Sequence, residues 1–180
     1  MILLTSFAEA EGILLSGGIG VIRTDTLYGI VARAQNQSAV ERVYALKSRD
    51  EKKSPIVLVS SIDQLFDAVD TPAVVASYWP GKVSIVLPSV DAPVWIRRDN
   101  HSVAYRLPHD SALQNLLNIT GPLIAPSANP EGKKPASSID EAVAYFGDEV
   151  DFYVDGGTIT DNSPSKLIRV SQSGDVEVLR

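Results

Sequence analysis

The sequence predicts a single α/β domain over residues 1–180, with a twisted sheet of mixed parallel and antiparallel strands and flanking helices. First, apolar runs typical of strands alternate with short helical patterns, as they do in α/β folds. Second, strands follow one another closely near both ends of the chain, which favours a mixed sheet over a purely parallel one. Third, 180 residues of which 44% are apolar suit one core, and we find no internal repeat, low-complexity segment or linker.

The first half of the chain opens with two short strands, predicted at residues 21–23 and 27–32 on either side of a polar stretch. Apolar residues near helical spacing predict a helix over residues 36–49, which ends in cations. Residues 54–61 are almost wholly apolar, which is typical of a strand buried on both faces.

Two helices are then predicted from their start signals. Residues 61–69 begin with Ser61 and carry Gln64 three positions later, which is a capping-box pattern. Residues 71–79 begin with a threonine as the cap and a proline at the first helical position.

The next elements are two strands, a helix and a short apolar run. Strands are predicted at residues 82–88 and 102–108, and each stops at a proline. A helix is predicted at residues 110–118, ahead of a glycine. Residues 122–129 form an apolar run that turns polar at its end.

The last part of the chain repeats the capping-box pattern in a helix predicted at residues 138–146. Three strands follow, at residues 151–155, 166–170 and 176–180. A Ser-Gly-Asp turn joins the last two, which predicts a hairpin.

Composition excludes several classes of protein. No apolar run approaches the ~20 residues of a membrane span, and the N-terminus has acids at Glu9 and Glu11 in place of a basic leader, so we expect no signal peptide. The absence of cysteine excludes disulfides, thiolate metal sites and a cysteine nucleophile, and it fits the cytoplasm. A net charge of -6 argues against a broad nucleic-acid-binding surface, while a local basic cleft stays compatible with it.

Four polar clusters interrupt the pattern of elements, at residues 23–29, 47–53, 125–135 and 155–166. The first holds more hydrogen-bonding groups than a plain turn needs. The second combines cations with a helix end, where a solvated surface is an equally good interpretation. The third directly follows a strand, where ligands bind in open α/β sheets. The fourth is glycine-rich, which lets a backbone approach a ligand but is also typical of a surface turn.

Common catalytic motifs are missing from the sequence. It has no P-loop, no dinucleotide-binding glycine pattern and no nucleophile elbow. His101 and His109 are the only histidines, and no motif places either of them, so neither a catalytic triad nor a zinc site is expected.

Six motifs occur in order along nearly the whole chain, and the sequence ends in Leu-Arg. They lie at residues 23–30 (Arg-Thr-Asp-Thr-Leu-Tyr-Gly-Ile), 47–49 (Lys-Ser-Arg), 79–81 (Trp-Pro-Gly), 103–108 (Val-Ala-Tyr-Arg-Leu-Pro), 126–132 (Pro-Ser-Ala-Asn-Pro-Glu-Gly), and 155–157 (Asp-Gly-Gly) followed by 165–166 (Ser-Lys). Together they resemble the YrdC family, the threonylcarbamoyl-AMP synthases. The chain departs from the family pattern at four positions, where Arg23 and Asp50 replace proline, Leu58 replaces a histidine that helps to hold threonine, and Lys166 replaces threonine.

The resemblance implies a YrdC-like sheet around an open cleft, and an enzyme that joins L-threonine, bicarbonate and ATP. The products are threonylcarbamoyl-adenylate and pyrophosphate, and the adenylate serves formation of N6-threonylcarbamoyladenosine at position 37 of tRNA. The implied partners are weakly bound tRNA and downstream transferase proteins. Mg²⁺ is expected with ATP, held mainly by phosphate oxygens and by no dedicated protein site.

The resemblance also implies roles for individual residues. The catalytic cations would be Lys47 and Arg49. Threonine and bicarbonate would be held by Thr24, Thr26, Tyr28, Arg106 and Ser165. ATP would be bound by Lys47, Arg49, Lys53, Ser102, Ser127, Asn129 and Arg180.

Local geometry gives two further expectations. Thr24 and Thr26 would point the same way if their segment were extended, with Asp25 pointing oppositely and fixing the loop. Lys47 and Arg49 would not share a face of a regular helix, so the helix must end near Leu46 for both to reach one site.

Two alternatives stay open from the sequence. One is an RNA-binding protein of the same fold without synthase activity, although the net charge of -6 counts against it. The other is an ATP-dependent enzyme that transfers a carbamoyl group to another amine.

Overall fold

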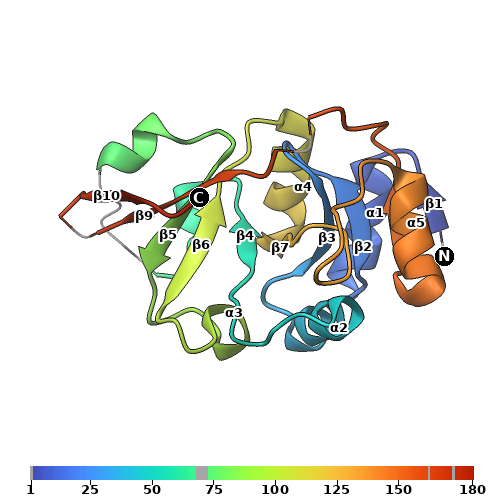
Figure 1. Ribbon diagram of the computed structural model, residues 1–180, viewed down its shortest axis with the longest axis horizontal. Helices are drawn as coiled ribbons and strands as arrows, with labels where there is room; N and C mark the ends of the chain where they lie inside the picture. The colour runs from blue at the N-terminus through green and yellow to red at the C-terminus, as the bar shows by residue number, and fades with distance from the viewer. Residues whose placement is uncertain (1, 68–72, 162, 172) are drawn as a thin grey trace.

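The computed structural model describes residues 2–67, 73–161, 163–171 and 173–180. Its ten strands are β1 (Ile2–Leu4), β2 (Gly20–Arg23), β3 (Tyr28–Arg33), β4 (Ile56–Leu58), β5 (Val83–Pro88), β6 (Ser102–Arg106), β7 (Leu123–Ile124), β8 (Phe152–Val154), β9 (Lys166–Val170) and β10 (Val176–Val178). They form one sheet in the order β1-β8-β2-β3-β7-β4-β6-β5-β9-β10, which runs across Figure 1 from β1 on the right to β10 on the left.

The helices are α1 (Phe7–Leu15), α2 (Gln37–Lys47), α3 (Val94–Arg97), α4 (Ser111–Thr120) and α5 (Ile139–Phe146), with 3-10 turns η1 (Ile62–Gln64), η2 (Ala73–Ser77) and η3 (Gly147–Glu149). Parallel pairs such as β4–β6 and β5–β9 occur beside antiparallel pairs such as β2–β3 and β9–β10. The predicted mixed α/β sheet with flanking helices is therefore confirmed.

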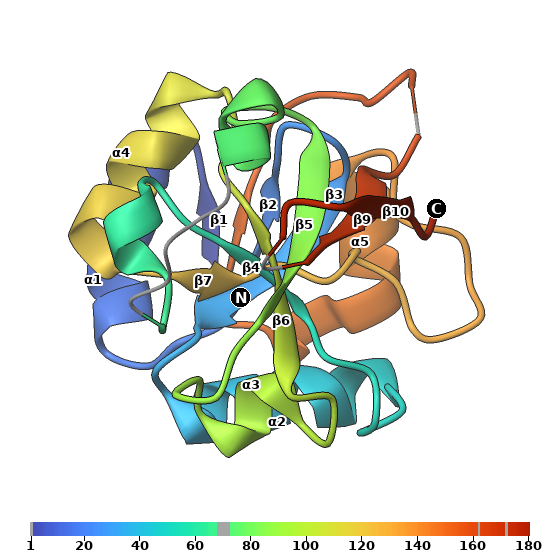
Figure 2. The same cartoon turned by 90° about the vertical axis from the view of Figure 1, so that its left-hand side faces the viewer.

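Alternate residues of the central strands reach two separate hydrophobic clusters. Val21 and Ile30 belong to the cluster that includes residues of α2 and α5, while their neighbours Ile22 and Val31 belong to the cluster under α1 and α4. Figure 2 shows α1 and α4 on one side of the sheet and α5 on the other. All four strand residues are fully buried, and burying such a side chain contributes roughly 1.5–3 kcal/mol.

The predicted strands all occur, although the run at residues 122–129 gives only the two-residue β7. The helix predicted over residues 61–69 is wrong over its described part, because Ile62–Gln64 form a single 3-10 turn and Leu65 is already extended. Its last two residues, 68 and 69, lie outside the described residues. The Ser61 side chain makes no capping hydrogen bond to the described turn. Gln64 instead accepts from the Ser60 amide at 2.9 Å and donates to the Leu117 carbonyl at 3.0 Å.

The helix predicted over residues 71–79 is also shorter than expected, since only the 3-10 turn η2 is present. Its predicted cap and first residue, Thr71 and Pro72, lie outside the described residues. Four described elements were not predicted, namely β1, α1, α3 and the 3-10 turn η3. Among the described helices, none is both long enough and apolar enough to cross a membrane.

Candidate active site

All four polar clusters meet at one cavity of about 300 Å³. Its polar lining consists of Thr24, Thr26, Tyr28, Arg49, Arg106, Ser127, Ser165 and Arg180. Its other lining residues are Leu27, Gly29, Ile56, Ala125, Pro126, Pro135 and Pro164. Among these described lining residues there are three arginines and no acidic side chain, so the cavity favours an anion.

Sheet pairing brings the first and third clusters together. Gly29 and Ser127 form an antiparallel bridge, the Ile30 amide donates to the Pro126 carbonyl at 2.9 Å, and the Ala128 amide donates to the Tyr28 carbonyl at 2.7 Å. A Cβ atom at Gly29 would lie 3.3 Å from the Pro126 oxygen, so the small residue permits this close approach.

The segment between β2 and β3 is a tight turn that Thr24 closes. The Thr24 hydroxyl donates to the Leu27 carbonyl at 2.7 Å and accepts from the amides of Thr26 and Leu27, each at 3.2 Å. The hydroxyls of Thr24 and Thr26 lie 3.2 Å apart and both residues line the cavity. A turn brings the two hydroxyls together, and not the extended segment considered above.

Arg106, at the end of β6, forms a buried ion pair with Asp25. Its Nη2 lies 3.0 Å from Asp25 Oδ1, and the two side chains are 4% and 6% exposed. The same Nη2 donates to the Thr24 hydroxyl at 3.3 Å. Burial raises the pKa of Asp25 while the Arg106 cation opposes that rise. Burial also lowers the pKa of Arg106, and Asp25 opposes that fall.

Arg49 and Lys47 diverge because α2 ends between them. Ser48 takes a left-handed conformation with φ of 50° and ψ of 40°, so the chain turns sharply after Lys47. Arg49 then reaches the cavity, where its Nη2 donates to the Ser54 carbonyl at 3.1 Å. Its guanidinium lies 5.6 Å from the centre of the Tyr44 ring.

Lys47 is buried beneath the third cluster and lies outside the described lining of the cavity. Its ammonium donates to the backbone carbonyls of Ser127 and Asn129. Burial lowers the pKa of Lys47 to about 7, the Arg49 cation adds to this, and Glu131 opposes it. The side chain therefore holds the segment that carries Ser127.

Three further predicted residues also lie outside that lining. Asn129 donates through Nδ2 to the carbonyls of Pro130 and Lys133, at 2.9 and 2.8 Å, and so folds its own loop. Lys53 is half-exposed and pairs with Glu131.

Ser102, the last of these residues, begins β6, whereas Arg106 ends that strand. Four residues of strand rise separate the two, or roughly 13 Å. The structure thus places Ser102 away from the end of β6 that reaches the cavity.

The C-terminal hairpin carries Arg180 to the cavity. The Arg180 amide donates to the Leu167 carbonyl at 3.1 Å, and the Leu167 amide donates back to the Arg180 carbonyl at 3.0 Å. The Arg180 side chain donates to the Ser165 carbonyl at 3.2 Å. Ser165 is buried, with its hydroxyl 2.9 Å from that of Ser84. The predicted pinning of the terminus by a hairpin is confirmed.

The four departures from the family pattern lie outside the described lining of this cavity. Leu58 is fully buried in the core, while Asp50 and Lys166 are exposed. Arg23 donates to the Gly156 carbonyl at 2.5 Å and so braces the glycine-rich segment.

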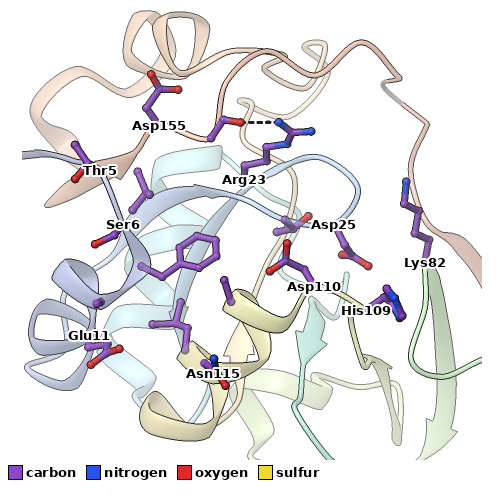
Figure 3. A pocket seen from close by; sticks show the side chains of 17 residues that line it. Thr5, Ser6, Glu11, Arg23, Asp25, Lys82, His109, Asp110, Asn115 and Asp155 are labelled. Atoms are coloured by element: carbon purple, nitrogen blue, oxygen red, sulfur yellow. Dashed lines mark hydrogen bonds between the residues drawn. The ribbon is translucent and has the colours of Figure 1, made fainter.

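A larger cavity of about 950 Å³ shares Thr24 with the first and is also lined by Asp25 (Figure 3). Charges of both signs line it, including Arg23, Lys82, Asp110 and Asp155. Its lining lacks the described side chains of Arg49, Arg106, Ser127, Ser165 and Arg180, so we take the smaller cavity as the candidate active site.

Sequence reasoning missed two parts of this site. It took Asp25 as a loop-fixing residue, although its carboxylate pairs with Arg106. It also missed the proline walls at Pro126, Pro135 and Pro164. The sequence did carry a signal for these walls, because the third and fourth polar clusters both contain proline.

Comparisons with known proteins identify related sequences and folds. A family model named Sua5_yciO_yrdC, described as telomere recombination, matches residues 12–180. The threonylcarbamoyl-AMP synthase of Marinobacter nauticus is 34% identical to this chain over 173 residues, which cover 91% of this chain and 90% of that protein.

Solved structures share the fold. P. abyssi Sua5 complexed with L-threonine matches with a TM-score of 0.86 at 26% identity, over 94% of this chain and 54% of the Sua5 chain. This chain thus spans about half the length of that protein. E. coli YciO matches with a TM-score of 0.83 at 21% identity, over 99% of this chain and 92% of YciO, and shows the fold alone.

The predicted YrdC-like fold is confirmed by these structures. The family model covers nearly the whole sequence, and a relative one-third identical covers nine-tenths of it. The chain therefore belongs to the Sua5, YciO and YrdC family.

Proposed function

We propose that this chain is an L-threonylcarbamoyladenylate synthase, which forms threonylcarbamoyl-AMP and pyrophosphate from L-threonine, bicarbonate and ATP. The observation that carries the proposal is the cavity in which Arg49, Arg106 and Arg180 meet without an acidic side chain among the described lining residues. Each reactant of this reaction presents anionic oxygens, namely the carboxylate of L-threonine, the bicarbonate ion and the phosphates of ATP. The synthase name of the M. nauticus relative supports the same reaction.

The chemistry needs fixed cations more than it needs a nucleophile. Threonine and bicarbonate give a carboxylated amine, with loss of water. One of its carboxylate oxygens attacks the α-phosphorus of ATP while the bond to the leaving pyrophosphate breaks. Negative charge builds up on the phosphates, and preorganised donors stabilise it.

The proposed roles follow from where the side chains lie. Arg49, Arg180 and Ser127, which all line the cavity, would bind the nucleotide phosphates. Arg106, with Thr26 and Ser165, would hold the carboxylated threonine, and Tyr28 would form a wall beside them. Lys47 would act from beneath, by fixing the carbonyls of Ser127 and Asn129. Ser127 would be a hydrogen-bond donor, because no histidine belongs to the described lining that could serve as its base.

The proposed reaction also implies a metal ion, a compartment and partner proteins. Mg²⁺ would be bound mainly by the phosphate oxygens of ATP, since the described lining offers it no side-chain carboxylate. We place the reaction in the cytoplasm. There the product would pass to transferase proteins that modify tRNA, and a direct contact of this chain with tRNA would be weak.

Pyrophosphate release by the purified chain tests the proposal. We expect release only when ATP, bicarbonate and L-threonine are present together, and an Arg49→Gln variant provides the control for a contaminating enzyme. Equal release without threonine, or no release under any condition, would refute the synthase. Release that requires a different amine would favour carbamoyl transfer to that amine.

A further inference from the structure

We infer that Asp25 is a positioning residue, whose carboxylate holds the Arg106 guanidinium in the orientation that receives the carboxylate of the amino-acid substrate. This inference rests on the proposed function, because it takes L-threonine as the ligand of Arg106. Asp25 itself lines the larger cavity and is absent from the described lining of the smaller one.

The first argument is that loop closure already has another agent. The Thr24 hydroxyl closes the turn through its contacts with Leu27 and Thr26. Neither carboxylate oxygen of Asp25 accepts a hydrogen bond of normal geometry from another described residue. The close partner of the carboxylate is Arg106, at 3.0 Å. A residue that only held the loop would use its oxygens on the amides of neighbouring residues, whereas the one backbone amide that acts on the Asp25 carboxylate among the described residues is its own.

The second argument is the geometry at Arg106. Its contact with Asp25 and its hydrogen bond to the Thr24 hydroxyl both use Nη2, so this one nitrogen is held from the side of the turn. A guanidinium recognises a carboxylate with two parallel N–H groups, which requires a fixed plane. Anchoring one nitrogen from behind sets that plane before the substrate arrives.

The third argument is electrostatic. Arg106 is 3% exposed, and the charge of Arg180 also acts on it. A buried cation beside other cations is unfavourable unless a carboxylate pairs with it. Figure 3 shows Asp25 in the neighbourhood of Asp110, Lys82 and His109, which line the larger cavity with it. Asp25 thus pairs with Arg106 without lining the smaller cavity, so no acidic side chain of the described lining competes there with an anionic substrate.

Calorimetric titration of the purified chain with L-threonine, without ATP, tests the inference. We expect Asp25→Asn to weaken threonine binding at least about tenfold and Asp25→Glu to restore it to within about threefold. The matched control is Asp110→Asn, which removes a carboxylate from the same larger cavity while asparagine still caps α4. We expect this control to bind threonine as the unchanged chain does.

A double-mutant cycle separates positioning from a general structural role. If Asp25 acts through Arg106, then Asp25→Asn has no further effect on the threonine Kd in an Arg106→Gln chain. Additive losses in the double variant would overturn the inference, and so would unchanged or tighter binding by Asp25→Asn alone. If Asp25→Asn alone does not fold, the double variant replaces it in the comparison, because it removes both charges and leaves neither one buried without a partner. The inference then requires the double variant and Arg106→Gln to have the same threonine Kd.

The result also separates the two proposals. Failure of the unchanged chain to bind threonine removes the substrate assignment, and the positioning role falls with it. Normal binding that Asp25→Asn leaves intact removes only the role of Asp25.

Discussion

At the scale of single residues, the two cations of the Lys-Ser-Arg motif do different work. Arg49 lines the cavity, whereas Lys47 is 2% exposed and donates to two carbonyls of the neighbouring segment. Spacing in the sequence could not separate them, because the left-handed Ser48 that turns the chain has no marker such as glycine or asparagine.

The buried ammonium of Lys47 gives a pH-dependent stability. Its pKa falls from 10.5 to about 7 on folding, so between pH 7 and 9 the unfolded chain holds a proton that the folded chain releases. The unfolding free energy should therefore rise with pH in this window, at up to ~1.4 kcal/mol per pH unit. We expect a contribution of about 2 kcal/mol between pH 7 and 9 by this linkage, lost in Lys47→Met.

Urea denaturation of both chains at pH 7 and pH 9 measures this contribution. The relevant quantity is the difference in unfolding free energy between the unchanged chain and Lys47→Met. If that difference is the same at both pH values, Lys47 does not titrate in this window.

Arg49 should matter far more for turnover than its exposed neighbour Lys52. We expect Arg49→Ala to lower the rate of pyrophosphate release at least about tenfold, or ~1.4 kcal/mol, because a phosphate-binding cation is lost. Lys52→Ala should leave the rate within about twofold, since its side chain is solvated. Near-normal turnover by Arg49→Ala would place the phosphates elsewhere in the molecule.

At the scale of elements, two capping-box patterns of the same type precede different structures, a helix at Ser138 and a single 3-10 turn at Ser61. At α5 the Ser138 hydroxyl accepts from the Glu141 amide at 3.3 Å, and the predicted helix forms. At residues 61–64 the Gln64 side chain accepts from the Ser60 amide, just as Glu141 accepts from the Ser137 amide, but it also donates to the Leu117 carbonyl of α4. Local pattern predicts a helix start only where no distant partner competes for the side chain, and that competition is invisible in the sequence.

The terminal hairpin separates the structural and chemical roles of Arg180. Its backbone pairs with Leu167, while its side chain reaches the cavity and the Ser165 carbonyl. We expect Arg180→Ala to raise the KM for ATP severalfold and to leave the melting temperature within about 1 °C, because alanine keeps the backbone pairing. Steady-state kinetics and thermal denaturation on the same preparations provide both readouts. Unaltered ATP kinetics would make this residue a strand end only.

At the scale of the whole molecule, the fold class and the four clusters were predictable because each depends on local pattern. Their meeting at one cavity was implied by the family resemblance, and in the structure β3 pairs with β7 and β5 pairs with β9. The contact between Asp25 and Arg106 depends on the placement of β6 beside β4 and β5, and no local pattern carries that information.

The cavity has a consequence for folding kinetics, since its lining extends from Thr24 to Arg180. Contacts so distant in sequence form late, after the loops between them have closed. A partly folded chain would then have no complete binding site. Saturating ATP and threonine should slow unfolding at least tenfold and leave the refolding rate within about twofold. Stopped-flow denaturant jumps with and without ligands measure both rates, and faster refolding with ligand would mean that the site forms early.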